Sequence, residues 1–113
     1  MDERELKMIA ALYFGLTPTP KIPKNVDFEV LRDFEGDTEG ARKLKIRWEN
    51  HMGAETGVAR LSPMDIMYYL GMKNAGENYR RAVDILKGIA KLHNLPLVRV
   101  GDRYLLVNPE HRR

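Results

Sequence analysis

The chain has 113 residues, enough for one domain, and 43% of them are hydrophobic while 31% are charged, a balance typical of a folded globular protein. The sequence contains no cysteine, which excludes disulfides, cysteine-based zinc sites and cysteine nucleophiles. Its formal net charge is only +3, but residues 1–40 carry 9 acidic and 5 basic residues, whereas residues 41–113 carry 7 acidic and 14 basic ones. This asymmetry indicates that the C-terminal part of the chain meets a polyanion.

No stretch approaches the length of about 18 apolar residues that a membrane span needs, and the N-terminus lacks the apolar core of a signal peptide. We therefore expect a cytoplasmic protein. The absence of glutamine and cysteine together with many charged residues is typical of thermophilic proteins, although six asparagines and six methionines point the other way.

Residues 2–14 are predicted to form a helix, because acidic residues open it and an apolar stripe follows at helical spacing: Leu6, Ile9, Ala10 and Tyr13. Three prolines within residues 17–23 exclude a helix or a central strand, so this segment is predicted to be an extended connector. The chain would then consist of an N-terminal extension, residues 1–36, and a main domain, residues 37–113.

The segment 26–53 fits two patterns. Within 26–36, apolar residues at positions 28, 31 and 34 favour a short helix, while those at 26, 28 and 30 alternate as in a strand. Within 38–53, the spacing of Ala41, Leu44, Trp48 and Met52 and an N-cap at Asp37 favour a helix. We expect two helices, and the alternative is a hairpin that turns at residues 36–40.

From residue 57 onwards the local signals agree. Residues 58–61 favour a short strand. Ser62 as N-cap, Pro63 in the first turn and Asp65 as partner in a capping box then start a helix. Gly71 tolerates the left-handed conformation in which helices often end, so this helix is expected to stop there.

A longer helix is predicted over 77–93, because apolar residues recur along one side of it: Tyr79, Ala82, Val83, Leu86, Ile89 and Ala90. Two apolar strands, 97–100 and 103–107, follow and are separated by only two residues, Gly101 and Asp102. This spacing is typical of a hairpin with a tight turn.

The hairpin register places Arg99 opposite Tyr104, and an arginine can stack on a tyrosine ring. Asn108 and Pro109 are expected to end the second strand, and residues 110–113 are expected to fray.

The order over residues 38–107 is therefore helix, short strand, short capped helix, tight turn, long helix and hairpin. This order resembles the winged helix-turn-helix family of DNA-binding domains. The resemblance implies an α+β, mainly helical fold with an extra N-terminal helix, in which 77–93 is the recognition helix and the hairpin is the wing. The two-residue turn departs from the family's long wing, which disfavours deep contact with the minor groove.

In that family, residues near the start of the recognition helix contact base edges. Carried over to this chain, the resemblance implies double-stranded DNA as the partner and Asn74, Asn78, Arg80 and Arg81 as the base-contacting residues. Arginine can form bidentate pairs with guanine, and asparagine with adenine. Other basic side chains on the same helical face and beside the hairpin turn are expected to contact phosphates: Lys73, Lys87, Lys91, Arg99 and Arg103.

Those of these residues that belong to the helix also fit a solvated helix face with ion pairs such as Glu77 with Arg80. Gly88 lies on this predicted exposed face, where a glycine permits the close approach of a phosphate or of another backbone. A second basic cluster within 42–47 can either contact phosphates or remain solvated.

Signals of catalysis are missing. Ser62 is explained as a helix cap, and no glycine-rich phosphate-binding motif occurs. His51 and Glu55 supply only two of the ligands that a metal ion needs. We therefore expect no enzymatic activity, no cofactor and no metal site.

Two functions remain. The first is a double-stranded DNA-binding protein, most simply a small transcriptional regulator, whose N-terminal helix either pairs with its twin in a homodimer or packs on its own domain. The second is a winged-helix module for protein–protein contacts in a replication, RNA-processing or viral assembly complex, which the acidic N-terminal part favours.

Overall fold

The computed structural model of the chain describes residues 1–19 and 21–113, so Pro20 of the predicted connector lies outside the described residues. The described part has an α+β fold of four α-helices, one 3-10 helix and four strands: α1 (Glu3–Tyr13), β1 (Phe28–Leu31), α2 (Thr38–Arg42), η1 (Trp48–His51), β2 (Val58–Leu61), α3 (Pro63–Leu70), α4 (Gly76–Leu92), β3 (Leu97–Val100) and β4 (Arg103–Arg112). Within these residues, no helix is long and apolar enough to cross a membrane.

The four strands form one antiparallel sheet in the order β1-β3-β4-β2. The predicted hairpin is confirmed, since Val100 pairs with Arg103 and Arg99 pairs with Tyr104. Gly101 has a φ of 63°, the left-handed conformation that a two-residue turn requires and that glycine adopts without strain.

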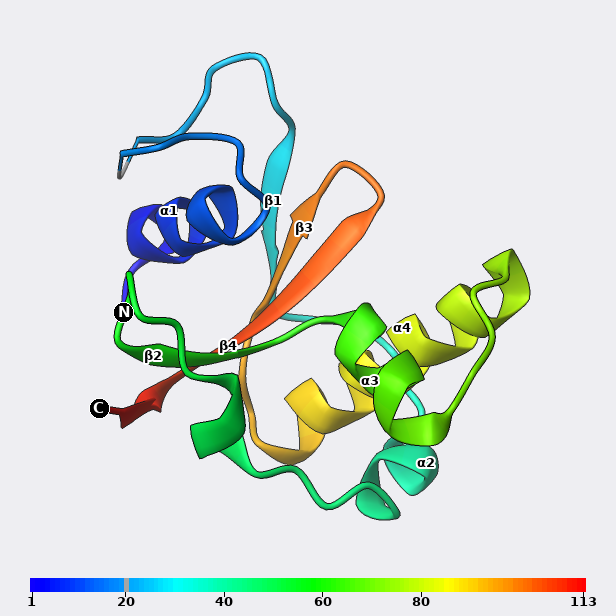
Figure 1. Cartoon of the computed structure of the whole chain (residues 1–113). Helices are drawn as coiled ribbons and strands as arrows, with labels where there is room; N and C mark the ends of the chain where they lie inside the picture. Colours follow the sequence, from blue (N-terminus) through cyan, green and yellow to red (C-terminus); the bar gives the residue numbers. More distant parts are fainter. Residues whose placement is uncertain (20) are drawn as a thin grey trace.

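Helices cover both faces of this sheet, as Figure 1 shows with α1 on one side and α2, α3 and α4 on the other. On the first face, Leu6 and Ile9 of α1 pack with Val98 and Leu105. On the second face, residues of α3 and α4 such as Ile66 and Leu86 pack with a separate set of strand residues that includes Leu61, Leu97 and Leu106. Alternate residues of the central strands therefore belong to two different cores.

The predicted N-terminal helix is confirmed by α1, whose apolar stripe lies against the chain's own sheet. The sequence leaves open whether this stripe packs on its own domain or on a twin helix, and the structure has the first arrangement. Because β1 also pairs with β3, residues on both sides of the expected boundary at residue 36 contribute to one sheet and its cores.

The prediction of a helix within 26–36 is wrong, because residues 28–31 form strand β1. The predicted alternative, a hairpin with the following segment, is also wrong, because β1 pairs with β3 instead. Phe28 and Val30 pack on the α1 side of the sheet and Leu31 packs on the α4 side. The alternation of the strand thus outweighs the helical spacing once a partner strand is available.

The prediction of a continuous helix over 38–53 is wrong as well. Asp37 is the N-cap as predicted, and its carboxylate accepts a hydrogen bond of 2.8 Å from the N–H of Gly40, but α2 ends at Arg42. Trp48 reaches the core from η1 and packs edge-on against His93. The apolar spacing is therefore met by two short elements and the loop between them.

Strand β4 runs beyond the predicted end at Asn108 and continues to Arg112. Its second half pairs with β2, where Ala59 lies opposite Asn108 and Val58 lies opposite Arg112, with an irregularity between the two pairs. The segment 110–112, predicted to fray, is therefore strand.

Candidate nucleic-acid interface

Local bonds determine where α3 starts and ends. The hydroxyl of Ser62 accepts a hydrogen bond of 3.4 Å from the N–H of Asp65, and the carboxylate of Asp65 accepts one of 2.8 Å from the N–H of Ser62. Gly71 ends the helix in the left-handed conformation, with a φ of 62°. The predicted capping box and glycine stop are both confirmed, and they position the turn that leads into α4.

Asn78 shapes this turn. Its side-chain amide donates a hydrogen bond of 2.9 Å to the carbonyl oxygen of Lys73. Lys73 and Asn74 are exposed, whereas Asn78 is only partly so. The structure thus directs the predicted base-contacting amide of Asn78 into the turn and leaves the side chains of Lys73 and Asn74 in solvent.

Arg80 and Arg81 lie on the exposed side of the first half of α4. Within the described part of the chain, no ion pair holds either guanidinium. Lys91, in the last turn of α4, differs from them because its ammonium group lies 3.8 Å from the carboxylate of Glu35. The first half of the helix therefore presents two guanidinium groups without ion pairs, and the second half pairs through Lys91 with Glu35 in the segment before α2.

The expectation that Gly88 is exposed is wrong, because this residue is buried. The backbone of Asp37 occupies the space that a side chain at position 88 would need, and the backbone of Lys87 and Gly88 occupies the space that a side chain at position 36 would need. The N–H of Asp37 donates a hydrogen bond of 2.8 Å to the carbonyl oxygen of Asp84. The backbone that approaches Gly88 closely therefore belongs to the same chain, at Gly36 and Asp37, and it covers one side of α4.

Residues from three other parts of the chain contact the hairpin turn. The N–H of Gly101 donates a hydrogen bond of 3.1 Å to the carbonyl oxygen of Asp27, just before β1. The hydroxyl of Tyr79 in α4 donates one of 3.1 Å to the carbonyl oxygen of Asp102. The guanidinium of Arg103 lies 5.2 Å from the ring centre of Phe14, at the end of α1. The turn therefore keeps a defined position relative to α4.

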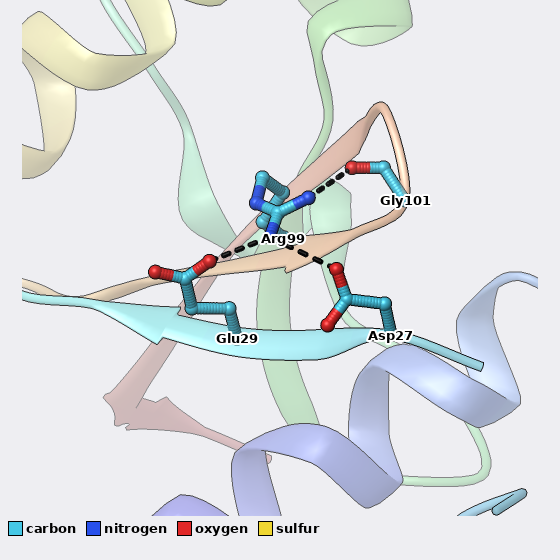
Figure 2. Close-up of polar contacts among 4 residues, drawn as sticks. All are labelled: Asp27, Glu29, Arg99 and Gly101. Atoms are coloured by element: carbon cyan, nitrogen blue, oxygen red, sulfur yellow. Dashed lines mark hydrogen bonds and ion pairs between the residues drawn. The ribbon is translucent and has the colours of Figure 1, made fainter. Parts of the chain in front are cut away.

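Arg99 forms the centre of a polar cluster between β1 and β3 (Figure 2). Its guanidinium donates hydrogen bonds to the carboxylate of Glu29 at 2.5 Å, to that of Asp27 at 3.1 Å and to the carbonyl oxygen of Gly101 at 2.6 Å. The bonds to Glu29 and then Asp27 raise the pKa of Arg99 above its ordinary value, so the guanidinium stays charged. Its charge is offset by two carboxylates.

The predicted stacking of a cation on Tyr104 involves a different residue. The ammonium group of Lys87 lies 5.4 Å from the centre of the Tyr104 ring, while Arg99 turns towards β1. A groove of about 510 Å³ lies between the hairpin and α4, from Gly76 to Lys87. Its lining includes the basic residues Arg80 and Lys87 and the acidic residues Asp84 and Asp102. Of the predicted site residues, the structure thus brings Arg80 and Lys87 to one groove and places Arg99 and Lys91 in ion pairs.

The remaining candidate residues lie apart from this groove. The basic residues of the 42–47 cluster are exposed, but they do not share one helix face because α2 ends at Arg42. The ring Nε2 of His51 lies 2.8 Å from the hydroxyl of Tyr69, and Glu55 forms an ion pair of 2.7 Å with Arg60. His51 and Glu55 therefore have separate partners.

Sequence reasoning assigns Tyr79 to the apolar stripe and misses its hydrogen bond to the hairpin turn. A tyrosine at the edge of a stripe is itself a signal, because a partly buried hydroxyl usually finds a partner. The sequence also gives no sign of the pairing of Arg99 with Asp27 and Glu29, which lie 72 and 70 positions away along the chain. No local pattern reveals that pairing.

No family model, no curated protein and no solved structure matches the chain.

Proposed function

We propose that this chain is a winged-helix protein that binds double-stranded DNA and reads the major groove with the first half of α4. The observation that carries the proposal is the exposed pair Arg80 and Arg81, free of ion pairs in the described residues, on a helix whose position relative to the hairpin turn is held by Tyr79. The order of elements from α2 to β4, with β4 between β3 and β2, supports the winged-helix assignment.

The dimensions and chemistry of α4 support this mode of binding. The major groove is about 12 Å wide and admits one helix. Arg80 and Arg81 can pair with guanine edges, and Asn74 in the preceding turn can pair with adenine. Lys73, Lys87 and Arg103 lie around this end of the helix or at the hairpin and can contact phosphates, which attract cations on both sides of the groove.

Three acidic residues of the N-terminal part, Asp27, Glu29 and Glu35, limit the proposed interface to one end of the molecule. Glu35 lies beside Lys91, and Asp27 and Glu29 hold Arg99. Carboxylates at these positions repel phosphates. We therefore assign Lys91 and Arg99 to the border of the interface rather than to its centre.

A transcriptional regulator is the simplest biological role for such a module. The apolar stripe of α1 is buried against the sheet, so a dimer formed through that stripe would have to displace it. We accordingly propose that one chain is sufficient to bind one duplex site.

A second function, protein–protein contact, is favoured by one observation. The outer side of α3 exposes two apolar side chains one helical turn apart, with Tyr68 86% and Met64 53% exposed. Adjacent exposed apolar residues of this kind are typical of protein interaction surfaces. This surface is a different one from the arginine pair of α4, so the two functions can be separated by mutation.

Fluorescence anisotropy with a labelled random-sequence duplex at several salt concentrations tests the proposal. We expect binding at about 50 mM salt, with an affinity that falls linearly on a log–log plot as salt is raised. On a site selected from the random-sequence pool, the combined substitution Arg80→Ala and Arg81→Ala should weaken binding at least about tenfold, because each lost base pairing is worth roughly 1–3 kcal/mol.

The matched control removes two exposed cations elsewhere, Arg4→Ala in α1 and Lys24→Ala before β1. It should change affinity much less than the α4 substitutions. Equal losses in both variants would contradict reading by α4, and no binding at low salt would leave the protein-interaction function.

A further inference from the structure

A second pocket, larger than the α4 groove, also borders the hairpin turn and shares Tyr79, Asp102 and Tyr104 with that groove. It has a volume of about 580 Å³, opens to solvent, and is lined by the end of α1, the start of α3, the first turn of α4 and the hairpin turn. Cavities that hold small ligands usually have volumes of about 300–1,000 Å³. The space is therefore large enough for a small organic molecule.

The walls of this cavity are unusually rich in aromatic rings. Tyr13 and Phe14 contribute from α1, Tyr79 from α4 and Tyr104 from the hairpin, while Met64 adds a flexible apolar side chain from α3. Tyr13 and Phe14 already contact each other edge to face, with ring centres 4.9 Å apart. Such rings favour a flat aromatic ligand, because offset and edge-on ring contacts add to the burial of apolar surface.

Two charged residues of opposite sign stand at the same cavity. Arg103 lies over the ring of Phe14, and Asp102 is its neighbour in the turn. Within the described residues, neither takes part in an ion pair, with the other or with any third group. A ligand with a single charge would be attracted by one of these residues and repelled by the other, whereas a ligand that carries both charges satisfies both.

We propose that this cavity binds a small aromatic zwitterion of the chemistry of an aromatic α-amino acid. The ring lies among the aromatic walls, the carboxylate faces Arg103 and the ammonium group faces Asp102. The ligand touches both Tyr79 and Asp102, the two residues whose hydrogen bond joins α4 to the hairpin turn.

This position gives the ligand a means of regulation, which rests on the proposed DNA binding. A ligand can shift the placement of the hairpin relative to α4 only if it binds one placement better than another. The ligand contacts both Tyr79 and Asp102. Its affinity therefore depends on how these two residues, and with them α4 and the hairpin turn, are placed relative to each other. We expect duplex affinity to change when the cavity is filled.

Binding is tested without DNA by two-dimensional ¹H–¹⁵N NMR titration with three probes. L-Tryptophan carries both charges, indole-3-propionate carries only the carboxylate and tryptamine carries only the ammonium group. We expect all amide shifts to centre on residues 13–14, 62, 64, 79 and 102–104. L-Tryptophan should bind about two- to fivefold tighter than either analogue, the factor that one exposed ion pair supplies.

Two surface variants assign the charges. Arg103→Met should weaken L-tryptophan and indole-3-propionate but not tryptamine, and Asp102→Asn should weaken L-tryptophan and tryptamine but not indole-3-propionate. The control Tyr68→Ala removes an exposed aromatic side chain outside the cavity and should change none of the three affinities.

The proposal is overturned if no probe shifts these resonances, if the shifts centre elsewhere, or if both charge variants weaken all probes equally. Duplex titrations with and without saturating L-tryptophan then test regulation alone. If the ligand-free protein does not bind the duplex, the proposed function is contradicted. If it binds and saturating L-tryptophan leaves the duplex affinity unchanged, only the regulatory step is contradicted, so the two failures can be told apart.

Discussion

The hydroxyl of Tyr79 in α4 donates a hydrogen bond of 3.1 Å to the carbonyl oxygen of Asp102 and so joins the helix to the hairpin turn. Burial, and after it the charge of Asp102, raises the pKa of Tyr79 above its ordinary value of 10.0. The folded protein therefore favours the neutral phenol, which can donate, over the phenolate, which cannot.

Stability should consequently fall at alkaline pH. Because the folded pKa of Tyr79 lies above the unfolded one, its contribution is fully present below pH 10 and is lost as pH rises through the folded pKa. Urea unfolding at about pH 8 and about pH 11 measures this loss, and Tyr79→Phe should lose less between the two pH values than the parent chain. An equal loss in both proteins would show that Tyr79 is not responsible.

Gly88 should be intolerant of a side chain. A methyl group at this position would overlap the backbone of Asp37, so Gly88→Ala should destabilise the fold by about 1–3 kcal/mol despite the better helix propensity of alanine. Urea unfolding measures the difference.

Gly76 in the same helix provides the control, because only the end of the Arg80 side chain approaches its position, at 3.7 Å. Gly76→Ala should leave stability unchanged or raise it slightly. If both alanine variants behave alike, the close packing of the two backbones at Gly88 is not a feature of the folded protein.

The sequence predicts best the parts of the fold that local bonds decide. The start of α3 at Ser62, its end at Gly71 and the turn at Gly101 all follow from residues within a few positions of one another, and all three predictions are confirmed. These features position α4, so the proposed reading helix lies where the sequence places it.

The parts decided by distant contacts could not be predicted. Phe28 and Val30 fit a helix or a strand equally well until β3 provides a partner, and β3 lies far along the chain. The same strand brings Glu29 to Arg99, which turns a predicted phosphate contact into an ion pair. The error in the fold and the change at the site therefore have one cause.

The cap of α3 should contribute measurably to stability. Ser62 is buried and satisfies the N–H of Asp65, so Ser62→Ala should destabilise the protein by about 1–2 kcal/mol. Thermal and urea unfolding measure this loss. Ser62→Thr keeps the hydroxyl and should recover part of the stability, and the absence of any recovery would argue against the cap.

Removing the carboxylates around Arg99 should strengthen duplex binding. Asp27→Asn with Glu29→Gln deletes two negative charges beside the hairpin and frees the guanidinium of Arg99, so affinity at low salt should rise and the salt dependence should steepen. Stability should change by no more than about 1 kcal/mol, because both carboxylates are largely exposed.

The control for this charge change is Glu3→Gln with Glu5→Gln in α1, on the opposite side of the sheet from α4. It should raise affinity less than the β1 substitutions do. Equal gains from both pairs would indicate a response to total charge, with no defined binding face.

The most direct test of the central claim is to map the duplex on the protein by ¹H–¹⁵N NMR. We predict that a bound duplex perturbs the amides of residues 73–81 and 101–104, and that the amides of the first half of α1 stay unchanged. Perturbations centred on α1 or on the outer side of α3, with residues 73–81 unaffected, would contradict the assignment of α4 as the helix that reads DNA.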